Sequence, residues 1–267
     1  MIANVQALRF VAAMLVVWHH VQGPLTGYSG IAIDTNFGQA GVDVFFVISG
    51  FIMFHTNADY PRTAGQFWLE RLVRIAPLYW LATWLVIAMA WAGVRPLNLN
   101  GFSTGNILTS MAFIPDLRAD GEPLPILTPG WTLNYEMFFY ALFGLTFMVR
   151  SQAASLLMLT ATFLGLWLAS ALAPLPFALH TLAQPITLEF AAGAGLAVLM
   201  RHVRPPSGAP STVIGYGLLI AGVASLAVID SLFYRSLYGE GVARALGFGL
   251  PAIAIVSGAL VLERAGH

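Results

Sequence analysis

The segment Leu8-Arg-Phe-Val-Ala-Ala-Met-Leu-Val-Val-Trp-His-His-Val21 is almost wholly apolar, yet it carries Arg9 and His20. Apolar stretches of about 18 residues or more predict membrane-spanning helices. Ionisable groups inside such helices are costly and usually functional. Eleven helical steps of 100° return to within about 20° of the starting direction. We therefore expect Arg9 and His20 on one helix face, roughly 16 Å apart along its axis. No cleavage site typical of a signal peptide follows, so we interpret residues 8–25 as a retained helix.

The chain has the composition of an integral membrane protein. Of its 267 residues, 58% are hydrophobic and 9% are charged, whereas soluble domains contain about 25% charged residues. Twelve basic residues balance twelve acidic ones, which argues against nucleic-acid binding. Cysteine is absent from the sequence, which excludes disulfides, thiolate metal sites and a cysteine nucleophile.

Several apolar stretches are long enough to cross a bilayer. They cover residues 8–25, 39–56, 75–94, 131–149, 153–173, 184–200, 211–230 and 241–262. A shorter apolar piece, 105–115, ends at Pro115, and we expect it to be re-entrant or interfacial. The predicted fold is an all-α polytopic bundle of about eight transmembrane helices, forming a single domain over residues 1–267.

The arginines predict the orientation, because cytoplasmic loops are enriched in Lys and Arg. With the N-terminus inside, the arginine-rich loops 57–74 and 201–210, Arg150 and Arg264 all fall on the cytoplasmic side. Loops 26–38 and 174–183 contain no Lys or Arg. Arg95, Arg118 and Arg235 are exceptions, in outside loops that also hold acidic residues. We therefore expect both termini in the cytoplasm.

Counting from the outer helix ends places four ionisable residues at a similar depth, roughly 6–8 Å below those ends: His20, Asp43, Glu136 and Glu189. Groups at this depth should face one another or a watery cavity. One interpretation is a catalytic site with His20 as general base or nucleophile, oriented by Asp43 or Glu136, and with Glu189 positioning a substrate. The alternative is a structural polar cluster, or carboxylates that face the interface.

A second group lies at the cytoplasmic side. Arg71 and Arg74 are spaced i, i+3, so they share one helix face, and Arg9 lies at the same membrane surface. Guanidinium groups bind phosphate well, so these three residues could hold a phosphorylated donor. Ordinary cytoplasmic anchoring is the alternative. At the outer mouth, Trp131 and Tyr135 could stack on a sugar ring, or could be interfacial belt aromatics.

Other motif chemistry is missing from the sequence. It contains no P-loop, no dinucleotide-binding glycine motif and no His-Glu-x-x-His. His55 falls at the membrane face opposite the His19–His20 pair, so we expect no metal site. Gly50, Gly193 and Gly195 are expected to make close helix contacts.

Four stretches together resemble the integral-membrane acyltransferase 3 family, and most of all the exopolysaccharide O-acetyltransferases of bacteria. They are Arg9-x10-His20, Gly41-Val-Asp-Val-Phe-Phe-Val-Ile-Ser-Gly-Phe51, Arg71-Leu-Val-Arg-Ile-Ala-Pro-Leu-Tyr-Trp80 and Pro129-Gly-Trp-Thr-Leu-Asn-Tyr-Glu-Met-Phe-Phe-Tyr140. Family members usually carry a further C-terminal helix pair, so the resemblance implies that this chain is short at its C-terminus.

The resemblance implies an O-acyltransferase of the bacterial inner membrane. It would move an acyl group, usually acetyl, from cytoplasmic acyl-CoA to a hydroxyl of an exopolysaccharide, O-antigen or lipid-linked sugar. His20 takes the catalytic position, with Asp43 and Glu136 at acidic motif positions. Arg9, Arg71 and Arg74 take positions linked to donor binding. Acyl-CoA is then a substrate, no cofactor is permanently bound, and the partners are the glycan and membrane lipids. A homo-oligomer is compatible with the sequence.

Two other classes stay open on the residues alone. A transporter of a small solute or ion would also place polar residues at one depth, although it would not need Arg9 and His20 on one helix face. A structural membrane subunit would tolerate the loss of His20 and would leave the polar residues unexplained.

Overall fold

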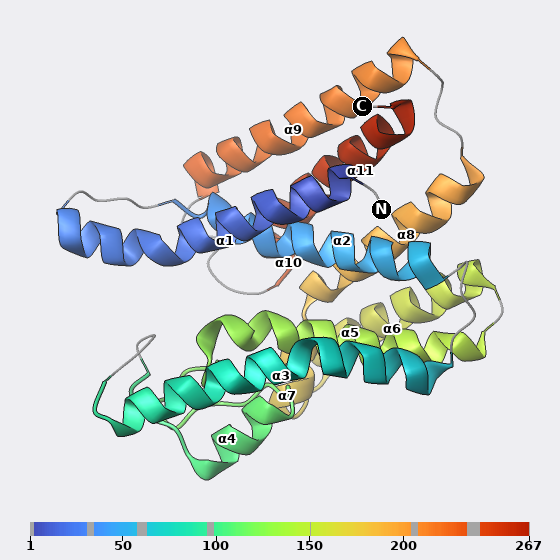
Figure 1. The fold of residues 1–267 in the computed structure, drawn as a ribbon. Helices are drawn as coiled ribbons and strands as arrows, with labels where there is room; N and C mark the ends of the chain where they lie inside the picture. The colour runs from blue at the N-terminus through green and yellow to red at the C-terminus, as the bar shows by residue number, and fades with distance from the viewer. Residues whose placement is uncertain are drawn as a thin grey trace. The chain divides into compact units, whose positions relative to one another are not determined.

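A computed structural model describes residues 3–30, 35–57, 63–94, 99–149, 151–203, 208–233 and 241–266. Over these ranges the regular elements are helices (Figure 1), so the all-α prediction is confirmed. The chain forms two compact units, Met1–Tyr60 with Pro185–His267, and Pro61–Gln184. Five arginines used above for orientation lie outside the described residues: Arg62, Arg95, Arg150, Arg204 and Arg235.

Each apolar stretch predicted to cross the membrane overlaps a helix, but the bounds differ, and α3 begins at Ala64, inside the predicted loop 57–74. These helices are α1 (Ala3–Ser29), α2 (Ala40–Asn57), α3 (Ala64–Trp91), α5 (Trp131–Leu145), α6 (Gln152–Leu172), α8 (Leu188–His202), α9 (Ala209–Phe233) and α11 (Leu250–Ala265).

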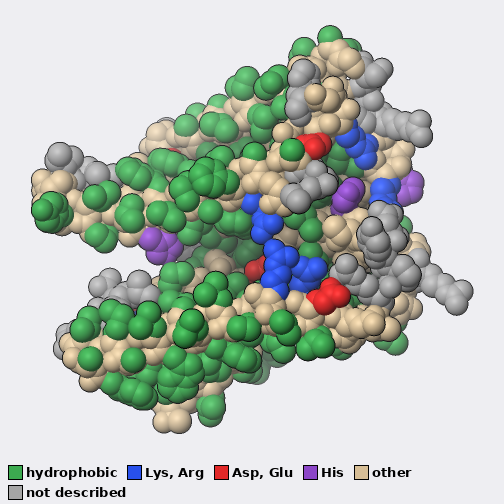
Figure 2. Space-filling model, in the orientation of Figure 1, with side chains coloured by type: hydrophobic (Ala, Val, Ile, Leu, Met, Phe, Trp, Pro, Cys, Tyr) green, Lys and Arg blue, Asp and Glu red, His purple; other side chains and the backbone are tan. Residues whose placement is uncertain are grey.

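Five helical segments in the described ranges are long and apolar enough to cross a membrane: Phe37–Asn57, Ala64–Trp91, Gln152–Leu172, Ala209–Ser231 and Val242–Ala265. Large hydrophobic side chains are exposed on several of them (Figure 2), with Leu81 at 69% and Ile220 at 67%. The helices α5 and α8 have 15 residues each, fewer than the roughly 20 that a full crossing needs. The total of eight crossings therefore stays a prediction.

In the first unit, α2 and α8 cross at two glycines. A Cβ atom on Gly50 would lie 2.0 Å from the carbonyl oxygen of Phe190, and one on Gly193 would lie 1.9 Å from that of Val47. Only hydrogen fits at either position, which confirms the expected close contact at these two glycines. Phe46 and Phe190 stack beside the crossing, with ring centroids 4.4 Å apart.

The helix that carries Arg9 and His20 rests on the start of α2 in the same way. The short helix η1 (Phe37–Gln39) leads into α2. A Cβ atom on Gly38 would lie 2.7 Å from the carbonyl oxygen of Leu15, and one on Gly41 would lie 2.4 Å from that of Ala12. Backbone therefore packs directly on backbone between α1 and this segment.

The last helix holds the ends of two others. The carboxylate of Glu263 accepts hydrogen bonds from the backbone N–H groups of Ala3 at 2.9 Å and Asn4 at 2.7 Å. These are first-turn donors of α1, which have no partner within their own helix. Arg264 donates to the carbonyl oxygens of Met200 and Val203 near the end of α8. The start of the first helix is thus fixed by a residue 260 positions away.

In the second unit, α3 packs on α5 through aromatic side chains. Phe67 is fully buried and its ring contacts those of Tyr140 and Phe143. The indole N–H of Trp68 donates to the carbonyl oxygen of Tyr140 at 3.1 Å, and the same indole covers Gly144, where a Cβ atom would lie 2.0 Å away. This packing fixes the register of α3 against α5.

The segment between α3 and α5 includes the short helix α4 (Thr104–Met111), which starts with a capping box formed by Ser103 and Asn106. Eight residues span about 12 Å, too little to cross a bilayer, as the sequence predicted for this piece. Arg118 is buried and pairs with Asp120 at 3.0 Å. Arg118 is therefore a structural charge within the segment, which accounts for its exception to the loop-charge rule.

The Arg118–Asp120 pair makes this segment sensitive to acid. Desolvation tends to raise the pKa of Asp120. Hydrogen bonds from Arg118 and from the backbone N–H groups of Asn100 and Glu122 outweigh it, so the pKa is lowered. A lowered folded-state pKa stabilises the segment above the unfolded value of about 3.9, and this stabilisation is lost as the pH falls through the folded value. We expect amide exchange at Asn100 and Glu122 to accelerate, beyond its intrinsic pH dependence, as the pH falls below about 4.

Asp120→Asn provides the control for this expectation. In that variant, protection of the two amides should be weaker at pH 6 and should not change further on acidification. Equal protection in both proteins at every pH would contradict the assignment.

Candidate active site

His20 is exposed on α1, and one ring nitrogen has a defined partner. Its Nδ1 atom lies 2.8 Å from the carbonyl oxygen of Val16. A carbonyl can only accept a hydrogen bond, so Nδ1 carries the proton in this contact. In the neutral ring, Nε2 then keeps its lone pair. This is the form of histidine that can take a proton or attack a carbonyl carbon.

His19 faces a different direction from His20. The two rings are 5.5 Å apart and nearly perpendicular, at 86°. His19 is half-buried, and its Cβ atom lies 3.0 Å from the position of a Cβ on Gly38. His19 therefore lies at the contact with η1, while His20 stays accessible, in agreement with their predicted 100° separation.

Asp43 is fully buried in the first unit, where Arg244 is its partner. The Nη2 atom of Arg244 donates to Oδ2 of Asp43 at 2.9 Å, and its Nη1 donates to Oε1 of Gln39 at 2.8 Å. Arg244 is itself only 5% exposed. Among the described residues, no hydrogen bond joins Asp43 to His20, so the orienting role predicted for Asp43 is not visible as a direct contact.

Glu189 lies in the first turn of α8 and is 3% exposed. Its carboxyl group lies close enough to that of Asp43 for the two to interact electrostatically. One of its oxygens, Oε1, lies 2.8 Å from the position of a Cβ on Gly249. The α2–α8 crossing thus brings together two of the four predicted polar residues, and one guanidinium faces both carboxyl groups.

Sequence reasoning missed Arg244. It lies in the apolar stretch 241–262, where the sequence pattern predicts only a spanning segment. The signal that could have found it is charge balance, because a buried carboxylate in a membrane helix needs a cationic partner.

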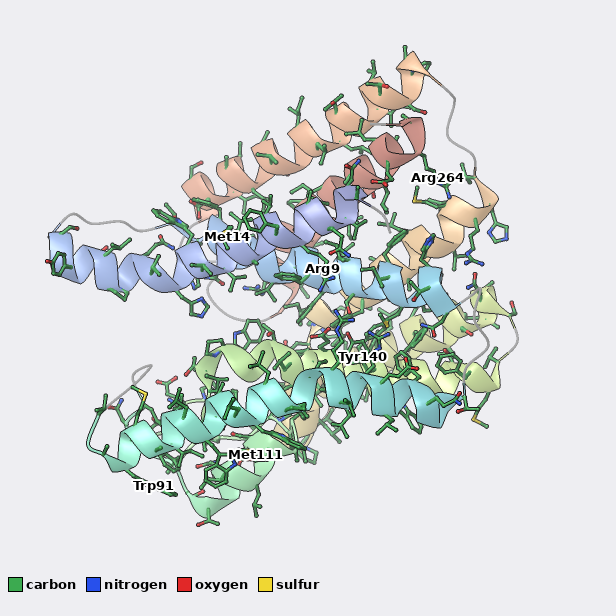
Figure 3. The ribbon with its side chains drawn as sticks, viewed as in Figure 1. Arg9, Met14, Trp91, Met111, Tyr140 and Arg264 are labelled. Atoms are coloured by element: carbon green, nitrogen blue, oxygen red, sulfur yellow. The ribbon has the colours of Figure 1, made fainter. Side chains whose placement is uncertain are left out.

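In the second unit, one tyrosine connects two predicted site residues. Arg71 is half-buried, with its Cζ atom 5.3 Å from the ring centroid of Phe67 and 5.7 Å from that of Tyr140. The hydroxyl of Tyr140 donates a hydrogen bond to Glu136. Tyr140, labelled in Figure 3, therefore links a predicted donor-binding arginine to a predicted catalytic carboxylate. The i, i+4 spacing of Glu136 and Tyr140 was the available signal.

The remaining predicted residues differ in accessibility. Arg74 is exposed, unlike Arg71. Tyr135 is 1% exposed and donates its hydroxyl to the carbonyl oxygen of Thr181 at 2.9 Å, which favours a structural role for its ring. Trp131 is half-buried and contacts Tyr135 edge-on, with centroids 5.9 Å apart.

Arg9 is half-buried on α1 (Figure 3), where its Nη1 atom donates to Gln6 at 3.3 Å. It belongs to the first unit, whereas Arg71 and Arg74 belong to the second. Likewise, His20 and Glu136 belong to different units. The cluster of three arginines and the pairing of His20 with Glu136 therefore stay predictions.

Comparison with known proteins decides the family. A family model described as an acyltransferase domain matches residues 2–265. The chain belongs to the acyltransferase 3 family. It is 38% identical over 239 residues to the exopolysaccharide production protein ExoZ of Rhizobium meliloti (strain 1021). The aligned region covers 86% of this chain and 68% of that protein.

A second acyltransferase aligns over a shorter region. The chain is 31% identical over 118 residues to acyltransferase MdmB of Streptomyces mycarofaciens, covering 42% of this chain and 29% of that protein. No solved structure was found to match the chain. The four motif stretches all lie within the residues that the acyltransferase 3 model matches, so the family predicted from them is confirmed. Membership of an acyltransferase family favours the enzyme over the transporter. An acyltransferase also requires an acyl donor.

Proposed function

We propose that this acyltransferase moves an acetyl group from acyl-CoA to a hydroxyl of an exopolysaccharide or its lipid-linked precursor, at the bacterial inner membrane. The name of its relative ExoZ, an exopolysaccharide production protein, supports the acceptor class. The candidate spans support a multi-pass membrane protein. Both termini would lie in the cytoplasm, as the distribution of arginines among the loops predicts.

The observation that carries the proposal is the hydrogen bond between Nδ1 of His20 and the carbonyl oxygen of Val16. With Nδ1 protonated, Nε2 accepts the proton of the acceptor hydroxyl while that oxygen attacks the thioester carbon. The C–S bond breaks, CoA leaves as a thiolate, and the proton on Nε2 passes to it. If His20 carries the acetyl group transiently instead, the same lone pair makes the bond.

Arg71 supports a donor site for the CoA phosphates. The rings of Phe67 and Tyr140 both pack beside its guanidinium group, so binding an anion there costs little side-chain ordering. Arg74 is exposed and less restrained, and Arg9 stays a predicted donor-binding residue. Glu136 would act near the reacting groups, and Trp131, with part of its ring accessible, would contact the sugar.

We expect Arg71→Ala to raise the KM for acetyl-CoA about tenfold, which corresponds to about 1.4 kcal/mol, and Arg74→Ala to raise it less. The reason is that the rings of Phe67 and Tyr140 restrain Arg71, whereas Arg74 is exposed. Steady-state kinetics in detergent, with donor and acceptor varied separately, measures both constants. A rise in the acceptor KM alone would contradict the donor assignment.

Tyr140 offers a matched control for this prediction. Tyr140→Phe keeps the ring beside Arg71 and removes only the hydroxyl that binds Glu136, so it should leave the donor KM unchanged. Tyr140→Leu removes the ring and should raise the donor KM. Identical donor KM values for these two variants would show that the stacking does not prepare Arg71 for the donor.

A further inference from the structure

Arg244 occupies an unusual place in the chain. It ends the short helix α10 (Val242–Arg244) and is followed at once by η6, a π-helical turn over Ala245–Gly249. Such turns are rare and frequently occur at functional sites. The guanidinium carbon of Arg244 lies 5.4 Å from the ring centroid of Phe248 in this turn. The turn thus packs against the guanidinium and brings Gly249 beside Glu189.

The two ends of the guanidinium fork contact one helical turn. Nη1 binds the side chain of Gln39 and Nη2 binds that of Asp43, four residues further along η1 and α2. The planar, rigid fork of arginine suits two fixed acceptors at once, whereas a lysine ammonium is a single point charge. Because Arg244 and Asp43 are 5% and 0% exposed, solvent does not compete for these hydrogen bonds.

The same turn is the surface on which α1 rests. Gly38 and Gly41 contact the α1 backbone at Leu15 and Ala12, and Gly38 also contacts Cβ of His19. The side chains at 39 and 43 contact Arg244, while the glycines at 38 and 41 contact α1. One turn is therefore held by Arg244 and supports α1 at His19, the residue next to His20.

We propose that Arg244 is a positioning residue for acyl transfer. By holding Gln39 and Asp43 it fixes the turn beneath His19, and so sets the direction in which the neighbouring His20 presents Nε2. Arg244 contacts neither donor nor acceptor in this account. The inference rests on the proposed catalytic role of His20.

The test uses variants that preserve charge. Removing the guanidinium outright would leave two buried carboxyl groups without their cation, which is strongly destabilising. Arg244→Lys keeps the charge and can reach Asp43, but it cannot bind Gln39 at the same time. We expect it to lower kcat about tenfold while the donor KM changes less than about twofold. Gln39→Leu removes the neutral contact with Arg244 together with the hydrogen bond that Gln39 donates to Asn36. It should lower kcat in the same way to a smaller extent.

Arg201→Lys is the matched control. Arg201 lies in the same unit and donates to the carbonyl oxygen of His55, away from the turn that Arg244 holds. It should retain the wild-type kcat and donor KM. Thermal unfolding of each purified variant measures folding separately, and if Arg244→Lys fails to fold, Gln39→Leu carries the test.

A double-mutant cycle with His20→Ala distinguishes positioning from a merely structural role. If Arg244 acts through His20, Arg244→Lys should not lower further the residual rate of His20→Ala, measured by slow accumulation of labelled product. Additive losses, or full activity in both Arg244→Lys and Gln39→Leu, would overturn the inference and leave the proposed function intact. Full activity of His20→Ala would instead overturn the proposed function.

Discussion

His20→Ala is expected to lower the acyl-transfer rate by about 10²- to 10⁴-fold, the usual contribution of a positioned general acid or base. The protein should remain folded, because His20 is exposed and its described contacts are the Val16 carbonyl and the His19 ring. Initial rates with labelled acetyl-CoA and thermal unfolding of the purified protein measure the two quantities separately.

His19→Ala is the matched control for this variant. It removes the neighbouring imidazole, keeps the Cβ atom that lies against Gly38 of η1, and leaves the tautomer of His20 in place. We expect it to retain activity within about tenfold of the wild type, since it removes only packing and no reacting group. The assignment of the base would be wrong if His19→Ala lost more activity than His20→Ala.

Gly193→Ala and Gly50→Ala are expected to destabilise the first unit by about 3 kcal/mol or more each, since the extra methyl group overpacks a closed contact. The added carbon atoms would lie 1.9 Å and 2.0 Å from backbone oxygens, so α2 and α8 would have to separate. That movement would also part Asp43 from Glu189. Denaturation of detergent-purified protein, followed by circular dichroism, measures the loss.

Two other helical glycines serve as controls. Gly165 in α6 and Gly217 in α9 have no heavy atom within 4 Å of the position of a Cβ. Gly165→Ala and Gly217→Ala should leave stability unchanged or raise it by up to about 1 kcal/mol through helix propensity. Equal unfolding of all four variants would show that the α2–α8 contact is looser than described.

The sequence predicted the helices well because their signal is local. Long apolar runs and the spacing of small residues were enough to place α1 to α3, α5, α6, α8, α9 and α11, and the close contacts at Gly50 and Gly193. The exact start of α1 could not be predicted from the local sequence, because Glu263, at the other end of the chain, caps this helix.

The candidate site was only partly predictable, because depth in a membrane does not determine which side chains meet. Counting residues placed Asp43 and Glu189 at a similar depth, and the structure brings them together. It could not show that Asp43 binds Arg244, a partner 201 residues away. Nor could it show that Tyr140 joins Arg71 to Glu136. Such pairings depend on helix rotation and on crossings formed by distant segments.

The two histidines show the same limit on a smaller scale. Helical periodicity correctly predicted that His19 and His20 point in different directions. His19, and not His20, lies against η1, because Gly38 has no side chain and lets the backbone of α1 approach at His19. The tautomer of His20 follows from a hydrogen bond to Val16, and this contact could be drawn only once α1 was known to be helical there.

The proposed activity is the transfer of an acetyl group from acetyl-CoA to a glycan hydroxyl through His20. The most direct measurement reconstitutes the purified protein in lipid vesicles, supplies radiolabelled acetyl-CoA and a de-acetylated exopolysaccharide, and follows label in the polysaccharide. We expect label that mild alkali releases, as it does from an ester, and that is absent with His20→Ala. Unlabelled polysaccharide with the wild-type protein, or equal labelling with His20→Ala, would contradict it.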